Sequence, residues 1–177
     1  KNPAAPEYTA PLRLADWDRL NTTFQAITGY YTEDVSESSG EFPEKITRAW
    51  VAPRFFETWG VPPAIGRGFS PQEERFRGPA AVVISDRFWR LRWAANPGVL
   101  GQTITLNGRP AEIIGVAPSA FTGTLAPFMP DVFVPVTQLR HGGEISSVQL
   151  IGRLRPGVAI GEAQADLMTL AAAMVIG

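Results

Sequence analysis

The Asn107-Gly108 pair constrains the fold of this chain more than any other feature of its sequence. It separates two stretches of strand-forming residues, 102–106 and 109–116. An Asn-Gly pair in that position is typical of a two-residue type I′ turn. Pairing across such a turn sets Leu106 opposite Arg109. The sequence therefore predicts an antiparallel hairpin near the middle of the chain.

Apolar residues at strand or helical spacing indicate the remaining elements. The expected strands span 30–35, 45–51, 80–84, 131–136 and 147–154. Three expected helices span 54–59, 86–95 and 160–174. A further helix is expected to begin near Leu14 and to end at Gly29, because one apolar stripe at helical spacing contains Leu14, Trp17, Leu20, Phe24 and Ile27.

The order of these elements predicts an α+β fold with two lobes. Strand and helix patterns occur at both ends of the chain, and a centre rich in proline and glycine lies between them. We interpret residues 1–50 and 145–177 as one discontinuous lobe, and residues 51–144 as a second lobe inserted into it.

Composition excludes several classes of protein. The 177 residues are 45% hydrophobic and 19% charged, which is typical of a globular domain. A net charge of −1 argues against a nucleic-acid-binding protein, which needs an excess of cations. The absence of cysteine excludes disulfides and thiol chemistry. No run reaches the roughly 20 apolar residues that cross a bilayer. We interpret the chain as excised from a longer protein.

Two residues are candidates for catalysis, and neither has the surroundings that catalysis requires. Ser85 follows an expected strand and precedes an expected helix, as the nucleophile of a hydrolase does. Its neighbours are not the small residues that such a sharp turn needs, so we interpret it as a helix N-cap. His141 is the single histidine and lies in a polar loop. We therefore expect no catalytic residue and no enzyme.

The carboxylates and glycines also offer no site. Asp16/Asp18 and Glu73/Glu74 are too close along a helix to face each other, so we interpret both pairs as a solvated surface. With one histidine and no cysteine we expect no metal site. Gly66-Arg67-Gly68 is a fragment of a phosphate-binding loop without its continuation, so no cofactor or nucleotide is expected.

The segment from Arg87 to Trp93 is open to two interpretations. Trp89 and Trp93 are one helical turn apart, and three arginines surround them: Arg87, Arg90 and Arg92. The first interpretation is a helix packed by its aromatic side, with the arginines reaching solvent. The second is an interface patch, because tryptophan and arginine are favoured anchors of protein contacts.

Seven segments, in this order, resemble the periplasmic core domain of MacB-like ABC-transporter permeases over about residues 14–174. They are Trp50-Val51-Ala52-Pro53-Arg54-Phe55-Phe56-Glu57-Thr58-Trp59-Gly60-Val61, Ile65-Gly66-Arg67-Gly68-Phe69, Val82-Val83-Ile84-Ser85 with Phe88-Trp89, Asn96-Pro97-Gly98-Val99-Leu100-Gly101, Ile104-Thr105-Leu106-Asn107-Gly108, Ile114-Gly115-Val116-Ala117-Pro118, and Gly152-Arg153-Leu154-Arg155-Pro156-Gly157. The pieces Phe121-Thr122-Gly123-Thr124 and Asp131-Val132-Phe133-Val134-Pro135 resemble the orphan-permease branch of the MacB/FtsX-type family.

The resemblance implies a place and a role for the chain. Such domains lie outside the inner membrane of a bacterium, between two membrane helices of the permease. They have a porter-like βαβ lobe made from both chain ends and an inserted mixed α/β, Sabre-like lobe. It also implies a partner ATPase subunit or domain, a permease homodimer and, in some members, a periplasmic adaptor. The family supplies no catalytic or binding residue to transfer, and the cargo is not implied.

Two functions of different classes follow. In the first, the domain transmits ATP-driven conformational change across the membrane to a periplasmic partner or an exported substrate. In the second, it is an extracytoplasmic module that binds a ligand or peptide without transport. The second predicts a preformed apolar cleft near Trp59, Phe69 and Trp89.

Overall fold

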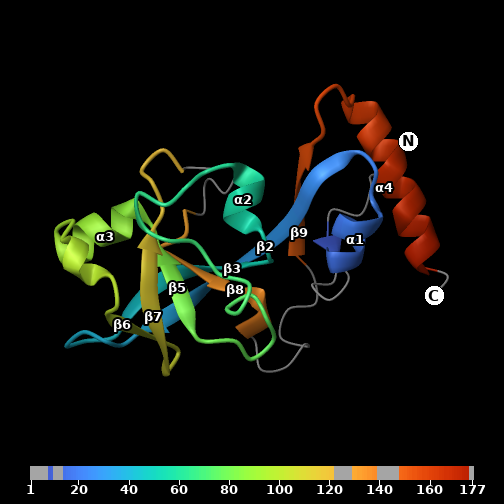
Figure 1. Ribbon diagram of the computed structural model, residues 1–177. Coiled ribbons are helices and arrows are strands. Elements are labelled where there is room, and N and C mark those ends of the chain that lie inside the picture. Colours follow the sequence, from blue (N-terminus) through green and yellow to red (C-terminus); the bar gives the residue numbers. More distant parts are fainter. Residues whose placement is uncertain (1–7, 10–13, 122–128, 139–147, 176–177) are drawn as a thin grey trace.

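The computed structural model describes residues 8–9, 14–121, 129–138 and 148–175. Its nine strands form one mixed sheet in the order β1-β9-β2-β3-β8-β5-β7-β4, and β6 pairs with both β2 and β7 (Figure 1). The strands are β1 (Tyr8–Thr9), β2 (Phe24–Glu37), β3 (Glu44–Val51), β4 (Ile65–Gly66), β5 (Ala81–Ile84), β6 (Thr103–Leu106), β7 (Arg109–Val116), β8 (Val132–Pro135) and β9 (Val148–Leu154). The helices are α1 (Leu14–Leu20), α2 (Phe55–Trp59), α3 (Asp86–Trp93) and α4 (Ile160–Val175), with 3₁₀ turns η2 (Pro97–Val99) and η3 (Val136–Gln138). The predicted α+β class is confirmed.

Six of the strands close into a ring. Pairing runs from β2 to β3, β8, β5, β7 and β6, and β6 returns to β2. At the closing seam the Ser38 amide donates to the Thr105 carbonyl at 3.0 Å, and the Asn107 amide donates to the Ser36 carbonyl at 2.8 Å. The Asn107 side chain adds a bond, since its Oδ1 accepts from the Ser36 amide at 2.9 Å. We call these six strands the ring.

Alternation along the strands gives the ring an inner and an outer apolar face. On β3, Ile46 and Trp50 belong to the inner cluster, while Ala49 and Val51 belong to the outer one. The inner cluster also takes Phe88 and Trp89, so α3, which follows the end of β5, covers one opening of the ring.

The outer face of the ring is covered by aromatic residues centred on α2. Phe55 is 1% exposed and lies against a set of rings: Tyr30, Phe56, Trp59, Phe121 and Phe133. Burying a ring of this size contributes about 1.5–3 kcal/mol. This cluster therefore holds α2 in place, although a helix of five residues is not stable alone.

The first and last helices lie at the end of the molecule away from α3 (Figure 1). There β9 pairs with the first half of β2 and with β1. The α4 carboxylate of Asp166 accepts from the amides of Thr22 and Thr23 at 2.8 and 3.1 Å. We call α1, α4, β1, β9 and the first half of β2 the terminal layer.

The predicted helix from Leu14 to Gly29 is wrong beyond its first two turns. Asn21 ends α1, because its Nδ2 donates to the Trp17 and Asp18 carbonyls while its Oδ1 accepts from the Phe24 amide at 2.8 Å. Phe24 and the residues that follow are on β2, and Gly29 lies within that strand rather than at a helix end.

The remaining predicted elements are found within a few residues of their expected bounds. The hairpin is confirmed in register: Leu106 pairs with Arg109 and Ile104 with Ala111. Asn107 and Gly108 have φ of 47° and 74°, as a type I′ turn requires. The sequence did not reveal β1, β4 or the full length of β2. The boundaries expected at 50/51 and 144/145 stay a prediction.

Candidate functional site

Of the two catalytic candidates, Ser85 is a helix cap. Its Oγ accepts from the Phe88 amide at 3.1 Å, and its φ and ψ of −74° and 154° are ordinary extended values. It therefore lacks the strained turn of a nucleophile, and its interpretation as an N-cap is confirmed. His141 lies outside the described residues.

The interpretation of the carboxylate pairs as a solvated surface fits Asp16 but is wrong for Glu73. Asp16 does pair with a neighbour in solvent, Arg19. Glu73 is 5% exposed, and two hydrogen bonds from Arg67, at 2.7 and 2.8 Å, lower its pKa. Gly66 ends β4, and Arg67 and Gly68 follow it in a segment that this ion pair holds in place. Burial raises the pKa of Glu74, whose Oε1 accepts from the backbone amide of Arg54 at 3.0 Å.

The first interpretation of α3, packing by its aromatic side, fits the structure. Trp89 is 9% exposed and its Nε1 donates to the Asn96 carbonyl at 2.8 Å. Trp93 packs edge-on against Phe88 and donates to Gln102. Each arginine of the segment is in an ion pair: Arg87 with Asp131, Arg90 with Asp86, and Arg92 with Glu37 and Glu44.

The expected apolar cleft near Trp59, Phe69 and Trp89 is wrong. Trp59 and Phe69 pack into the outer aromatic cluster, and Trp89 belongs to the inner one. Trp59 and Phe69 therefore lie on the outer face of the strands and Trp89 on the inner face, so the three side chains line no common cleft.

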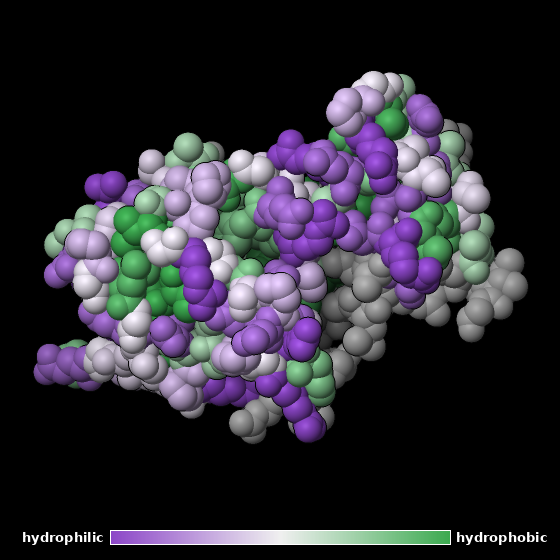
Figure 2. All heavy atoms as spheres, viewed as in Figure 1, coloured by the Kyte–Doolittle hydropathy of each residue, from purple (hydrophilic) through white to green (hydrophobic). Residues whose placement is uncertain are grey.

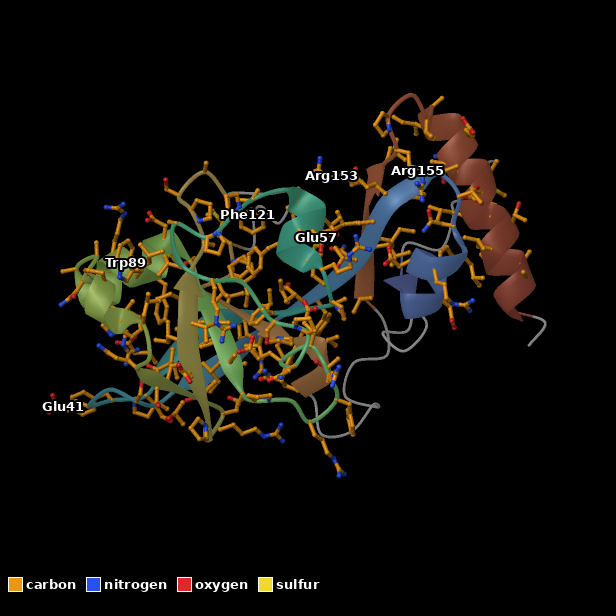
Figure 3. All side chains as sticks on the ribbon, in the orientation of Figure 1. Glu41, Glu57, Trp89, Phe121, Arg153 and Arg155 are labelled. Atoms are coloured by element: carbon orange, nitrogen blue, oxygen red, sulfur yellow. The ribbon has the colours of Figure 1, made fainter. Side chains whose placement is uncertain are left out.

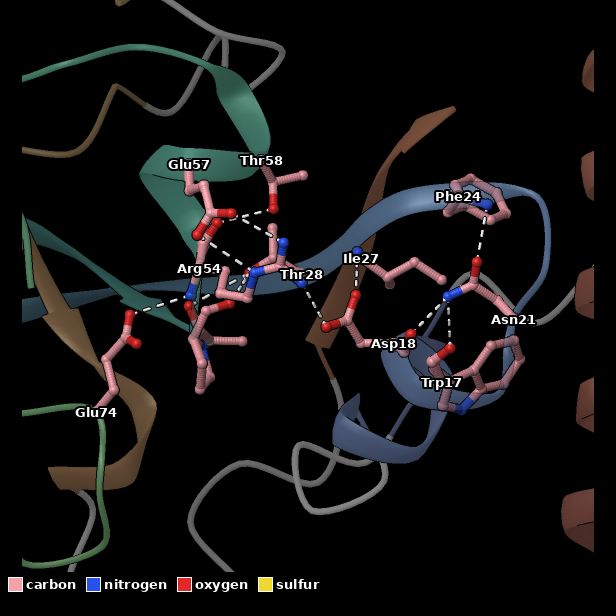
Figure 4. Close-up of polar contacts among 12 residues, drawn as sticks. Trp17, Asp18, Asn21, Phe24, Ile27, Thr28, Arg54, Glu57, Thr58 and Glu74 are labelled. Carbon is pink, nitrogen blue, oxygen red and sulfur yellow. Dashed lines mark hydrogen bonds and ion pairs between the residues drawn. The ribbon is translucent and has the colours of Figure 1, made fainter. Parts of the chain in front are cut away.

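The structure places a network of polar contacts where the terminal layer meets α2, and we call it the junction (Figure 4). Its centre is Arg54, whose guanidinium contacts Asp18 of α1 at 2.8 Å and Glu57 of α2 at 2.9 and 3.3 Å. The hydrogen bonds from Arg54 lower the pKa of Glu57. Asp18 in turn accepts from the Ile27 amide of β2 at 2.8 Å. One arginine thus ties three elements together.

Two further contacts cross the junction. Arg153 of β9 donates from Nε to the Thr58 carbonyl of α2 at 2.7 Å. Thr28 of β2 donates from Oγ1 to the Pro53 carbonyl at 2.9 Å. Hydrophilic side chains gather over this region, between the two ends of the molecule (Figure 2). Figure 3 shows Glu57 and Arg153 close to it, whereas Trp89 lies at the far end. The junction is therefore polar, and each of its two sides contributes both a cation and a carboxylate.

Sequence reasoning missed the junction because its partners are far apart in the chain. Asp18 and Arg54 are 36 positions apart, and Thr58 and Arg153 are 95 apart. Arg54 also has a φ of 62°, in the left-handed region, and no glycine or asparagine marks that position. Helix α2 ends at Gly60, whose φ of 69° is one that glycine adopts readily.

A second feature is a groove of about 760 Å³ at the opening of the ring opposite α3. It lies where β5 and β7 begin, and its wall contains Trp50, Leu106, Ala111 and Val134. Arg48 lies over the Trp50 ring, 3.9 Å from its centroid. Glu33 accepts from Trp50 Nε1 at 2.7 Å and pairs with Arg48.

The described part of the chain shows neither a metal site nor a membrane span. No group of three or more His, Cys, Asp or Glu side chains in it is arranged to hold a metal ion. None of its helices is both long enough and apolar enough to cross a bilayer.

Solved structures with the same fold include a periplasmic and an extracellular domain of transport proteins. The periplasmic region of MacB from Actinobacillus actinomycetemcomitans aligns with a TM-score of 0.72 at 17% identity, covering 92% of this chain and 73% of that one. The extracellular domain of the noncanonical ABC-type transporter YknZ from Gram-positive bacteria aligns with a TM-score of 0.73 at 15% identity, covering 94% and 84%. A domain of a putative permease protein from Porphyromonas gingivalis gives 0.57 at 18% identity, covering 83% and 64%.

The sequence itself identifies the family. Residues 2–170 match the MacB-like periplasmic core domain family, so this chain belongs to that family of ABC-transporter permease domains. No curated protein matches the chain. The family is not a known class of enzyme, and the solved domains that share the fold are periplasmic or extracellular.

Proposed function

We propose that this domain transmits ATP-driven conformational change from the membrane part of a bacterial inner-membrane permease to a periplasmic partner or an exported substrate. In this proposal residues 1–50 and 145–177 form the lobe joined to the membrane helices, and residues 51–144 form the lobe that is moved. Strand β3 and the second half of β2 follow the moved lobe, because they pair with β8 and β6. An ATPase subunit or domain supplies the energy, the permease is a homodimer, and the domain performs no catalysis.

The junction is the observation that supports this function most. Its two sides are joined by the ion pair between Arg54 and Asp18 and by the hydrogen bond from Arg153 to the Thr58 carbonyl of α2, while Glu57 holds the Arg54 guanidinium from the α2 side. Such bonds are directional and can exchange for water at modest cost, since exposed ion pairs contribute only about 0–1 kcal/mol. A polar junction can therefore transmit force and also shift, whereas a large apolar contact would be fixed.

A second support is β2, which runs without a break from the terminal layer into the ring. Its first half pairs with β9 and its second half with β3 and β6. Movement of β9 and α4 thus reaches the ring through one continuous strand.

The test uses the whole permease with its ATPase in lipid nanodiscs. This chain contains no cysteine, so Gln164→Cys on α4 and Leu91→Cys on α3 can carry spin labels after removal of any accessible cysteine outside it. Both positions are exposed. We expect the distance between these labels, measured by pulsed electron resonance, to differ between the nucleotide-free and ATP-trapped states.

A matched pair of labels, Leu91→Cys with Arg109→Cys, serves as the control because α3 and β7 both belong to the proposed moving lobe. Its distance should stay constant. ATP hydrolysis at the normal rate with no change in the Gln164–Leu91 distance would overturn the proposal.

A further inference from the structure

The groove at the open end of the ring has walls and a rim of different character. Leu106, Ala111 and Val134 belong to the inner cluster and, although each is at most 8% exposed, line the groove with apolar groups. Arg77 and Arg109 are exposed and line the same groove. Among the residues that the structure describes, neither of these two arginines makes an ion pair.

The groove is positively charged although the chain as a whole has a net charge of −1. The lining includes three arginines and no carboxylate. Arg48 is already compensated by Glu33, which also accepts from the Trp50 indole. The two rim arginines therefore provide the positive charge that is left for a ligand.

We propose that this groove binds an amphipathic organic anion, a carboxylate carried on an unbranched apolar chain. The apolar chain would lie along Leu106, Ala111 and Val134, and the carboxylate would pair with Arg77 and Arg109. Guanidinium groups bind carboxylates by paired hydrogen bonds, so these two arginines favour an anionic head group over a neutral or cationic one. The volume of about 760 Å³ is within the usual range of small-molecule sites.

The strands around the groove favour a small molecule over an extended peptide. A peptide commonly binds a sheet by adding a strand to a free edge. Here β3, β5, β7 and β8 each have strand partners on both sides. None of these four offers an edge, so recognition falls to side chains alone. This site is separate from the junction and does not depend on the proposed movement.

Calorimetric titration of this chain with three 12-carbon amphiphiles below their micellar concentrations tests the assignment. Dodecanoate is the probe, and dodecyltrimethylammonium and dodecyl maltoside carry the opposite charge and no charge. We expect one site for dodecanoate, with a dissociation constant below about 1 mM, and at least about tenfold weaker binding of the other two.

The double variant Arg77→Gln/Arg109→Gln should weaken dodecanoate binding by about tenfold, the effect of losing two partly exposed charge contacts. The matched control Arg90→Gln/Arg155→Gln removes two exposed charges elsewhere and should bind as the parent does. Circular dichroism checks that both fold.

The position of the site is tested on the unaltered chain. Dodecanoate should shift the amide resonances of Leu106 and Ala111 in a nuclear magnetic resonance titration, and should leave those of α4 unchanged. The proposal is overturned by the absence of binding, by equal binding of the ammonium compound, by equal binding to the Arg77→Gln/Arg109→Gln variant, or by shifts confined to other surfaces. These binding measurements use this chain alone, so their outcomes can be interpreted even if the movement test fails.

Discussion

At the scale of the residue, Arg54 combines a backbone cost with a side-chain gain. Its left-handed φ of 62° costs about 1–2 kcal/mol for a residue with a Cβ. Its guanidinium gains contacts with Asp18 and Glu57, and its amide donates to Glu74. A conformation of this kind persists only where the surrounding contacts determine it.

Two substitutions of Arg54 separate the cost of its backbone conformation from the gain of its side-chain ion pairs. Arg54→Ala keeps the strain and loses the ion pairs, so we expect the free energy of unfolding to fall by about 1 kcal/mol. Arg54→Gly loses the same ion pairs but relieves the strain, so it should be more stable than Arg54→Ala by about 1 kcal/mol. Urea unfolding of both variants measures the difference. A glycine variant less stable than the alanine variant would contradict this explanation.

Asp166 gives a pH dependence that can be predicted in sign. Burial by itself raises its pKa, but the hydrogen bonds from Thr22 and Thr23 outweigh burial and lower the pKa of the folded state. Its contribution is therefore complete above the carboxylate's unfolded pKa and is lost as pH falls through the lower, folded value.

Asp166→Asn should therefore lower the free energy of unfolding by about 1–2 kcal/mol at neutral pH. The deficit relative to the parent should shrink as the solution is acidified below the unfolded pKa. Urea unfolding at a series of pH values measures it. Asp16→Asn, in an exposed pair with Arg19, is the control and should change little. A deficit that does not change with pH would rule out the carboxylate as its source.

At the scale of the element, two glycines, one in a strand and one in a helix, have opposite effects on stability. A Cβ on Gly29, within β2, would lie 2.8 Å from Val148 Cγ2 and 3.0 Å from the Gln149 carbonyl oxygen. A Cβ on Gly161, in the first turn of α4, would meet nothing within 4 Å. The first glycine permits close approach of β2 and β9, and the second only adds freedom to the unfolded chain.

We expect Gly29→Ala to destabilise the fold by about 1–3 kcal/mol, the usual cost of overpacking. Gly161→Ala should stabilise it by about 0.5 kcal/mol, because alanine is the better helix former. Thermal unfolding of the two variants provides the comparison. Equal effects of the two substitutions would show that β2 and β9 can separate without loss.

Local patterns predicted those elements whose signals lie within the element itself. Asn107-Gly108 determined a hairpin and its register, and Ser85 marked the start of a helix, because turns and caps depend on neighbours in the chain. The helix beyond Leu20 was predicted wrongly because Phe24 and Ile27 continue an apolar stripe that both helix and strand can bury. The Asn21 side chain ends the helix and starts the strand, because it hydrogen-bonds both to the Trp17 carbonyl of α1 and to the Phe24 amide of β2.

The junction and the groove could not be predicted in the same way. Arg54, Asp18 and Arg153 meet only after β2, β9 and α2 have packed, and no local pattern encodes which charge will find which partner. The groove depends on closure of the ring between β2 and β6, a contact between residues some 70 positions apart. The family resemblance predicted the overall class of the protein, whereas these side-chain contacts are seen only in the folded structure.

At the scale of the whole molecule, closure of the ring depends on few bonds. Three hydrogen bonds hold the seam between β2 and β6, and one of them uses the Asn107 side chain. Asn107→Gly preserves a turn sequence that suits type I′ geometry and removes only that side chain.

We expect this variant to lose about 1 kcal/mol of stability at the seam, the value of one hydrogen bond. Amide exchange of Ser36 and Ser38 should then be about fivefold faster, as local opening becomes easier. The amide of Val83, inside the ring, is the internal control and should exchange at nearly the rate of the parent. Uniform acceleration across the chain would mean that the seam does not open on its own.

The unbroken course of β2 has a mechanical consequence. Fourteen residues at about 3.3 Å each make a rod of about 46 Å. If the helices at one end tilt it by roughly 10° about that end, the hairpin at the other travels about 8 Å. In the proposed function, a small rocking of the terminal layer would thus become a displacement wider than a side chain at the far end of β2.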